Sequence, residues 1–239
     1  MSILPRLMGR NEAGNISTHS GQSNLCGGGY IKHRVFCLEG FSLIESKTKL
    51  TEADALIIVD VQNDFLPGGA LAVAQGDEII QPLNKYIEQF VIRNLCIVAT
   101  RDWHPENHIS FHSQGGVWPA HCIANTSGAE FSALLQLPDS SLTISKASQK
   151  HIDAYSGFEN TDLKTLLRRR QVSRVFVGGL ATDYCVMNTV LDALKLGFQV
   201  CLLLDAIRAV NIKPEDGQQA IHKMTKQGAM VIKLEDLEI

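Results

Sequence analysis

The chain has 239 residues, 45% of them hydrophobic and 20% charged, which suits one domain with a sizeable core, with or without a small appendage. Its formal net charge of −3 gives no electrostatic reason to expect nucleic acid or an anionic membrane as a partner. No apolar stretch is long enough to span a bilayer.

Residues 1–51 differ in composition from the rest of the chain. They are rich in Gly, Ser and Asn, so we predict a flexible extension, apart from a short hairpin at 35–44, ahead of a single domain at 52–239. The N-terminus has no apolar signal-peptide core, and the six cysteines form no Cys-x-x-Cys pair. Both features favour a reduced, cytoplasmic protein. A mitochondrial transit peptide is the alternative, because the extension has Arg and Ser residues and few acids.

From residue 52 onward, apolar strand-like runs alternate with helical patterns. Strands are predicted at 55–59, 95–99, 142–145, 174–177, 200–204 and 229–232, and helices at 79–91, 163–167, 186–194 and 214–228. Strands that are apolar on both faces and alternate with helices predict a doubly wound, mostly parallel α/β sheet with helices on both faces. Residues 103–141 lack these patterns, and so long a loop in a compact domain is usually functional.

Chemically active side chains follow four of the predicted strands. Asp60 follows the first, Asp102 and His104 follow the second, Lys146 follows the third, and Cys185 lies in the turn after the fourth. Each has an ordinary explanation, because a strand-end Asp is usually a cap and a single Cys is usually a small buried apolar residue. The carboxyl ends of parallel strands meet at one edge of the sheet, however, so the set together predicts a site there.

Cys185 is the candidate nucleophile. The run Gly178-Gly179-Leu180-Ala181-Thr182-Asp183-Tyr184-Cys185-Val186 predicts a strand, a tight glycine turn and a helix with the thiol in its first turn. A helix N-terminus carries partial positive charge, so we expect a lowered thiol pKa. Asp60 can accept the thiol proton and Lys146 can stabilise the ionised pair, which points to nucleophilic acyl transfer. No histidine lies at the strand ends beside Cys185. A catalytic cysteine–histidine pair is therefore an alternative only if a loop supplies the histidine.

Asp102 and His104 form a second candidate group. Residues two apart in an extended segment face the same way, so both can contact one ion. His121 in the long loop can supply a third ligand, and His108 is a further candidate. Three oxygen and nitrogen ligands leave coordination positions open, as a catalytic or ligand-binding metal requires. Spacing alone explains these histidines equally well as hydrogen-bonded loop residues.

Four segments resemble the nicotinamidase (pyrazinamidase-like) family of the isochorismatase-like cysteine hydrolase superfamily. They occur in family order within residues 54–232, as Asp60–Phe65, Thr100–Pro105, Trp118–Cys122 and Ala181–Val186. The Asp, Lys and Cys are typical of the superfamily, and Asp-x-His with a later Trp-Pro-x-His-Cys is typical of nicotinamidases. Two features depart from the family pattern: the extension, and Ala147 after Lys146, where many relatives have Gly.

The resemblance implies hydrolysis of nicotinamide, and of pyrazinamide as a related amide, with nicotinate and ammonia as the products from nicotinamide in NAD salvage. In this family pattern Cys185 attacks the amide carbon to form a thioester, Asp60 shuttles the proton, and Lys146 supports both. The backbone N–H groups of Ala181 and Cys185 would form an oxyanion hole, next to a cis peptide between Leu180 and Ala181.

The resemblance also implies one divalent metal ion that binds the pyridine nitrogen. Its ligands would be Asp102, His104 and His121, with His108 open, and zinc is expected, with iron and manganese as alternatives. Three aromatic side chains match family positions that pack against the substrate ring: Phe65, Trp118 and Tyr155. Without the resemblance, these residues would be interpreted as ordinary core aromatics.

Two other functions stay open. One is a related hydrolase acting on isochorismate, a ureido compound or another small amide, which would need no ring held by a metal. The other is a binding module without catalytic activity on the same fold. The presence of Asp60, Lys146 and Cys185 together argues against a binding module. A homo-oligomer is compatible with either function.

Overall fold

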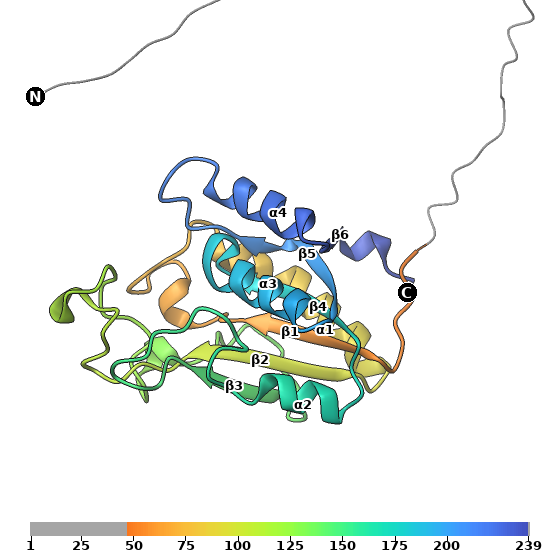
Figure 1. Ribbon diagram of the computed structural model, residues 1–239, viewed down its shortest axis with the longest axis horizontal. Coiled ribbons are helices and arrows are strands. Elements are labelled where there is room, and N and C mark those ends of the chain that lie inside the picture. Colours follow the sequence, from red (N-terminus) through yellow and green to blue (C-terminus); the bar gives the residue numbers. More distant parts are fainter. Residues whose placement is uncertain (1–46, 239) are drawn as a thin grey trace, which may run out of the picture. The chain divides into compact units, whose positions relative to one another are not determined.

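The computed structural model describes residues 47–238, and its six strands form one parallel sheet in the order β3-β2-β1-β4-β5-β6 (Figure 1). The strands are β1 Asp54–Val59, β2 Cys96–Asp102, β3 Leu142–Lys146, β4 Arg174–Leu180, β5 Gln199–Arg208 and β6 Met230–Ile232. The predicted parallel α/β sheet is therefore confirmed. Strands β2, β4 and β5 continue further toward their carboxyl ends than the apolar runs indicate, and the hairpin expected at 35–44 lies outside the described residues.

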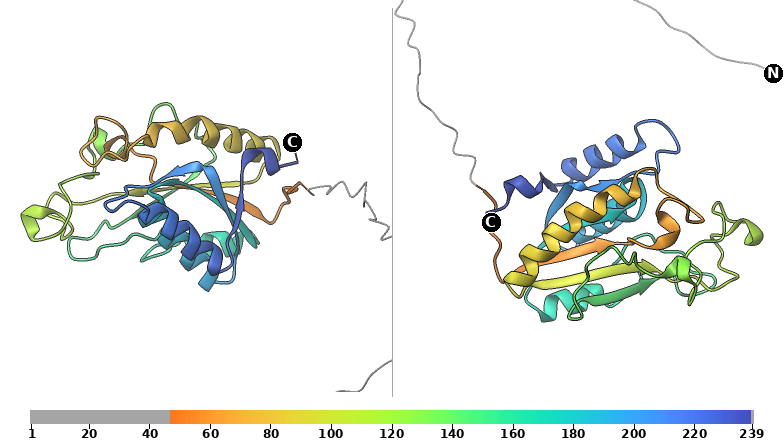
Figure 2. Two further views of the ribbon diagram at one scale, coloured as in Figure 1. Left: turned by 90° about the horizontal axis from the view of Figure 1, so that it is seen from above. Right: turned by 180° about the vertical axis from the view of Figure 1, so that it is seen from behind.

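Helices cover both faces of the sheet (Figures 1 and 2). Helix α1 Ile80–Ile92 packs in one core layer, and α2 Leu163–Arg169, α3 Met187–Lys195 and α4 Asp216–Lys226 pack in the other. Adjacent residues of β1 show the division, because Ile58 belongs to the same core layer as Phe90 of α1, whereas Ile57 belongs to the layer that contains Val190 of α3. Within residues 47–238, no helix is long and apolar enough to cross a membrane.

The tight turn predicted at Gly178 and Gly179 is wrong, because both glycines belong to β4. Gly179 has a φ of +126°, and a Cβ atom there would lie 2.0 Å from the carbonyl oxygen of Val59. The glycine is needed for the close approach of β4 to β1 rather than for a turn. The chain turns after the peptide bond between Leu180 and Ala181, which is cis as expected.

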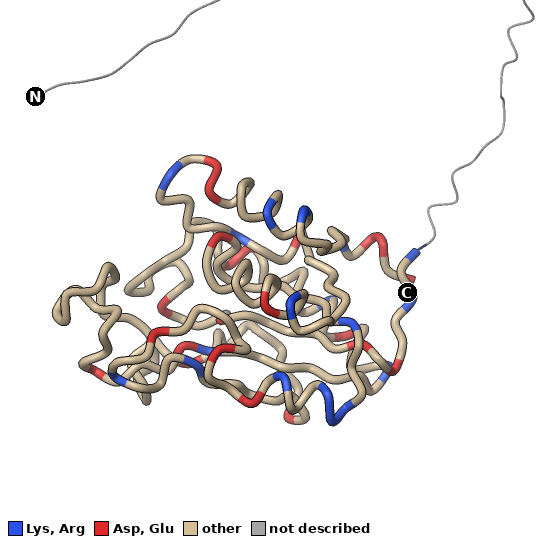
Figure 3. The backbone as a smooth tube through the Cα atoms, in the orientation of Figure 1, with Lys and Arg blue, Asp and Glu red and all other residues tan. Residues whose placement is uncertain are grey.

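Segments ahead of β1 pack against the end of the chain. The N–H of Thr48 donates to the carbonyl of Asp236, and Leu50 is buried in the α1 core layer. Charges of both signs are interspersed along the described chain (Figure 3). The four cysteines of this part of the chain are free thiols: Cys96, Cys122, Cys185 and Cys201.

Candidate active site

Three strand ends and one turn converge on the ammonium group of Lys146. This group lies 2.5 Å from Asp102 Oδ1, 3.0 Å from Asp60 Oδ2 and 3.4 Å from Cys185 Sγ. All four residues are buried, and they come from β3, β2, the end of β1 and the turn after β4. The structure therefore brings together the acid, lysine and thiol that the sequence places after separate strands.

Asp60 is held where β1 leaves the sheet. Its φ is +50°, a left-handed conformation that is uncommon for residues other than glycine and recurs at functional sites. Its N–H donates to the carbonyl of Thr100, and the Thr100 hydroxyl donates to Asp60 Oδ1 over 2.6 Å. Asp60 Oδ2 faces the Lys146 ammonium at 3.0 Å and has no further hydrogen-bond partner among residues 47–238. This oxygen is thus available to accept a proton.

The thiol lies in a turn wider than the one expected. Residues Thr182–Val186 form a π-helical turn, and α3 begins only at Met187, so Cys185 precedes the α-helix instead of lying in its first turn. The carboxylate of Asp183 anchors this turn by accepting hydrogen bonds from the backbone N–H groups of Val210 and Asn211. Wide π-type turns of this kind are frequent at functional sites.

The expected lowering of the Cys185 pKa is also wrong for this arrangement. Burial raises the pKa of the thiol well above its usual value, and although Lys146 opposes this, the charges of Asp60 and Asp102 add to it. Burial likewise raises the pKa of Asp60 against the opposing charge of Lys146. Burial alone would lower the pKa of Lys146, but the two carboxylates outweigh it and raise that pKa. The thiol therefore needs an acceptor for its proton, and Asp60 is beside it.

A group of possible metal ligands, called the metal-type group below, lies next to this cluster and consists of Asp102, His104 and His121. Ligand atoms of Asp102, His104 and His121 lie within 4.8 Å of one another, and all three residues are buried. The Nδ1 atom of His104 is 3.2 Å from the Ala147 carbonyl oxygen, and Nδ1 of His121 is 2.8 Å from that of Pro119. A histidine that donates its Nδ1–H to a backbone carbonyl keeps a lone pair on Nε2, which can bind a metal ion. Metal-binding histidines are commonly held in this way. These donors fit zinc, iron or manganese.

His108 lies beside this group and not in it. Its ring lies against the ring of His104, with centroids 4.2 Å apart and ring planes inclined by 32°. Its Nδ1 is 2.8 Å from the Ser110 hydroxyl oxygen and its Nε2 is 3.1 Å from the Ile152 carbonyl oxygen, so both ring nitrogens have partners. In this arrangement His108 contacts His104 and has no free nitrogen for an ion. A second close group, formed by the side chains of Asp60, Asp102 and Cys185, already surrounds the Lys146 ammonium.

A small pocket connects the thiol with the metal-type group. It is lined by Asp102, His121, Ala181 and Cys185, by the three aromatic residues expected near a ring, and by Leu71, Val73, Tyr184 and Val210. Trp118 donates its indole N–H to the Tyr155 hydroxyl oxygen over 3.0 Å, which links two of those aromatics across the pocket. The free volume is about 40 Å³, well below that of typical ligand sites, so entry of a ring requires side chains to move.

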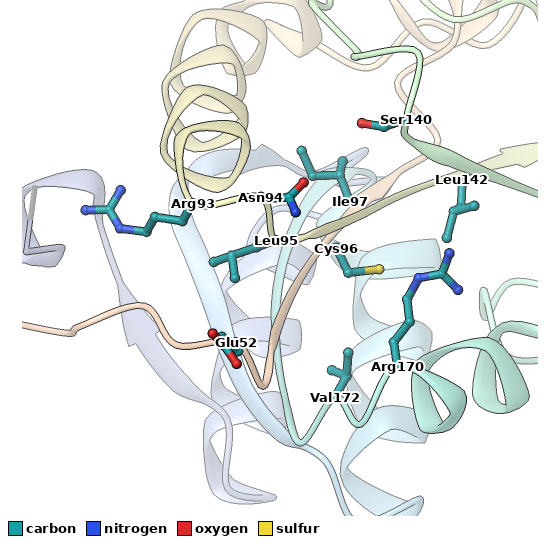
Figure 4. Close-up of a pocket in the computed structure, with 10 residues that line it drawn as sticks. All are labelled: Glu52, Arg93, Asn94, Leu95, Cys96, Ile97, Ser140, Leu142, Arg170 and Val172. Atoms are coloured by element: carbon teal, nitrogen blue, oxygen red, sulfur yellow. The ribbon is translucent and has the colours of Figure 1, made fainter.

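A more open hollow of about 430 Å³ lies at the amino ends of the strands (Figure 4). Cys96, Arg170 and Leu142 border it, and in Figure 4 the Arg170 side chain extends into the space beside Cys96 and Leu142. No residue of the Lys146 cluster lines this hollow. The chemistry therefore collects in the small pocket at the opposite end of the sheet, where an α/β fold normally carries its site.

Several residues of the site are not expected from sequence. Tyr184 lines the pocket next to the nucleophile, and its place directly before Cys185 is the only signal for it. Thr100 and Gln62 hold Asp60 and Asp102 through side-chain hydrogen bonds. Val210 reaches the pocket from the loop after β5, and no local pattern indicates it, because that contact joins distant segments.

The comparisons with known proteins agree with this geometry. A family model described as the isochorismatase domain matches residues 54–236. The chain belongs to the isochorismatase family. The nicotinamidase of Escherichia coli is 40% identical over 205 residues, which cover 77% of this chain and 96% of that protein.

Two solved structures are similar to this member of the isochorismatase family. The pyrazinamidase of Pyrococcus horikoshii in complex with zinc is 52% identical, with a TM-score of 0.74 and coverage of 76% of this chain and 99% of its own. PnC1 of L. infantum in complex with nicotinate is 37% identical, with a TM-score of 0.75 and coverage of 80% and 98%. The family resemblance predicted from the four sequence segments is confirmed.

Proposed function

We propose that this chain hydrolyses nicotinamide to nicotinate and ammonia, a step of NAD salvage, and accepts the related amide pyrazinamide. The observation that carries this proposal is the convergence of Asp60, Lys146 and Cys185, because the thiol of this cluster lines a pocket that Asp102 and His121 also line, and both of these belong to the candidate metal-ligand group with His104. The thiol cluster supports cysteine amidohydrolase chemistry, and the neighbouring group separates this substrate class from other small amides. The similarity to a nicotinamidase and to a nicotinate-bound relative supports the choice.

In the proposed reaction Cys185 attacks the amide carbon while Asp60 takes its proton. The raised pKa of Asp60 makes its carboxylate a stronger base than an exposed one. The carbonyl oxygen becomes negative as the C–S bond forms, and the backbone N–H groups of Ala181 and Cys185 are the proposed donors to it. The proton held by Asp60 passes to the leaving nitrogen, so ammonia departs and a thioester remains.

Water then completes the reaction. Asp60, again a carboxylate, takes a proton from a water molecule that attacks the thioester carbon, and the C–S bond breaks to release nicotinic acid, which gives its proton to solvent and becomes nicotinate. The proton returns to the thiolate of Cys185, which restores the starting state. Lys146 keeps its positive charge throughout, because the two carboxylates raise its pKa, and it offsets the negative charge that moves between Asp60 and the thiol.

Asp102, His104 and His121 are the proposed ligands of one divalent ion, with zinc preferred because a zinc-bound relative is similar to this chain. When bound, the ion supplies a Lewis-acid partner for the pyridine nitrogen and so orients the ring. Phe65, Trp118 and Tyr155 are proposed to pack against that ring, which supports a flat aromatic substrate.

The decisive experiment is ammonia release by purified protein from nicotinamide and from benzamide, which lacks the ring nitrogen, before and after chelation. We expect nicotinamide turnover to fall by about 100-fold or more on chelation, because orientation contributes several kcal/mol to a barrier. Benzamide should be a poor substrate in both states. Undiminished turnover of nicotinamide by metal-free protein, or equal use of both amides, would instead support the related hydrolase that needs no metal-held ring.

A further inference from the structure

Gln62 is a buried amide that the proposed mechanism does not use. Its side chain makes three hydrogen bonds: Nε2 donates to the carbonyls of Asp102 over 2.8 Å and Ala129 over 2.9 Å, and Oε1 accepts from the Asp102 N–H over 2.8 Å. Both main-chain polar groups of Asp102 are therefore paired with one side chain. Asp102 is also the residue whose carboxylate joins the Lys146 cluster to the metal-type group.

This pairing continues the sheet past the point where β1 leaves it. The β1–β2 ladder ends at the pair Val59 and Thr100, and the N–H of Asp60 donates to the Thr100 carbonyl. In a parallel sheet every second residue of a strand directs its N–H and C=O to the same neighbour, so the next residue of β2 that faces β1 is Asp102. The main chain has turned away at Asp60, and the Gln62 amide takes the place of the missing strand residue.

The carboxylate of Asp102 has two partners at once. Its Oδ1 accepts a hydrogen bond from Lys146, and its Oδ2 lies 3.7 Å from Nε2 of His104. A shift of the Asp102 main chain would therefore displace one oxygen from the ammonium or the other from the ion site.

We propose that Gln62 is a positioning residue that fixes Asp102 so that its carboxylate serves the Lys146 cluster and the metal group together. The proposal rests on the function proposed above only where it uses turnover, since metal affinity is measured without substrate. Partners that hold a metal ligand from behind typically change metal affinity by about 10–100-fold when they are removed. A displacement of about 1 Å in a catalytic group can lower turnover by about 100-fold.

The test uses Gln62→Met, which keeps the length and apolar volume of the side chain and removes all three hydrogen bonds. Gln62→Glu is the second variant, because it keeps the acceptor for the Asp102 N–H and loses both donors. The matched control is Gln89→Met in α1, where another buried glutamine bonds only to Arg93. The measurements are zinc affinity of the folded protein by competition with a chromophoric chelator, steady-state kinetics with nicotinamide, and melting temperature.

We expect zinc affinity to fall about 10–100-fold in both Gln62 variants and kcat/KM to fall about 100-fold, mainly through kcat. Gln89→Met should change neither quantity by more than about twofold. A purely structural role predicts a lower melting temperature with wild-type zinc affinity in the folded fraction, and that result overturns the proposal. So does a wild-type protein that binds no zinc. If the Gln62 variants bind zinc more weakly and the zinc-loaded wild-type protein has no activity on nicotinamide, the positioning role stands and the function proposed above is refuted.

Discussion

Replacing Gly179 with alanine tests how the close approach of β1 and β4 builds the site. An added Cβ would lie 2.0 Å from the Val59 carbonyl oxygen and 2.6 Å from the Val59 nitrogen. Both are main-chain atoms of a central strand, so no side chain can rotate to make room. Because real Cβ contacts are essentially never shorter than 3.0 Å, the two strands must separate by about 1 Å.

The expected loss of stability has two parts. A φ of +126° lies outside the backbone conformations that alanine normally adopts, and holding alanine there costs about 1–3 kcal/mol. Forcing one extra carbon into a packed core costs about 1–3 kcal/mol more. The sum of about 2–6 kcal/mol is a large share of a typical unfolding free energy of about 5–15 kcal/mol. It corresponds to a melting temperature lower by at least about 4 °C for a domain of this size.

Gly115→Ala is the matched control, because Gly115 also has a positive φ, of +86°, but a Cβ there would meet no atom within 4 Å. Urea denaturation followed by circular dichroism gives both unfolding free energies. We expect the Gly179 variant to lose about 1–3 kcal/mol more than the control, since both variants carry backbone strain and only the Gly179 variant adds a clash. Its folded fraction should also lose turnover, because β1 carries Asp60 and β4 leads to Cys185. Equal losses in the two variants would refute the account of close strand approach.

Three further predictions concern the catalytic cluster and the sheet end opposite to it. Cys185→Ala should abolish ammonia release while the protein folds and binds zinc, and residual turnover within about tenfold of wild type would rule out the thioester route. Asp60→Asn should lower kcat about 10²–10⁴-fold, as expected for loss of a general base. Because burial raises the pKa of Asp60, its carboxylate disfavours the folded state at neutral pH, so the same variant should melt at the wild-type temperature or above it. A marked drop in that temperature would mean that Asp60 is a structural cap. Asp54→Ala should destabilise the fold by about 2–4 kcal/mol in urea denaturation, with little change in KM. The variant removes the carboxylate partner of Arg174, which contacts both Asp54 oxygens at 2.7 and 2.6 Å. A loss below about 1 kcal/mol would contradict this.

The sequence by itself determined the class of fold and the residue types of the site. Apolar runs such as 55–59 and 175–177 are buried on both faces of a parallel sheet, and this burial is why their composition predicts the architecture. The convergence of Asp60, Lys146 and Cys185 also follows from order along the chain, because the carboxyl ends of parallel strands meet at one edge.

Only the tertiary structure decided how those residues are held and charged. The pKa of Cys185 is raised by burial and by carboxylates from other strands, against the lowering effect of the Lys146 charge. Gly179 has a role in strand packing that no neighbouring residue reveals, because the atom it avoids belongs to Val59. Both are long-range properties. Local sequence fixes local conformation and periodicity, whereas the dielectric surroundings and close approaches of a group are set by segments that meet only in the folded chain.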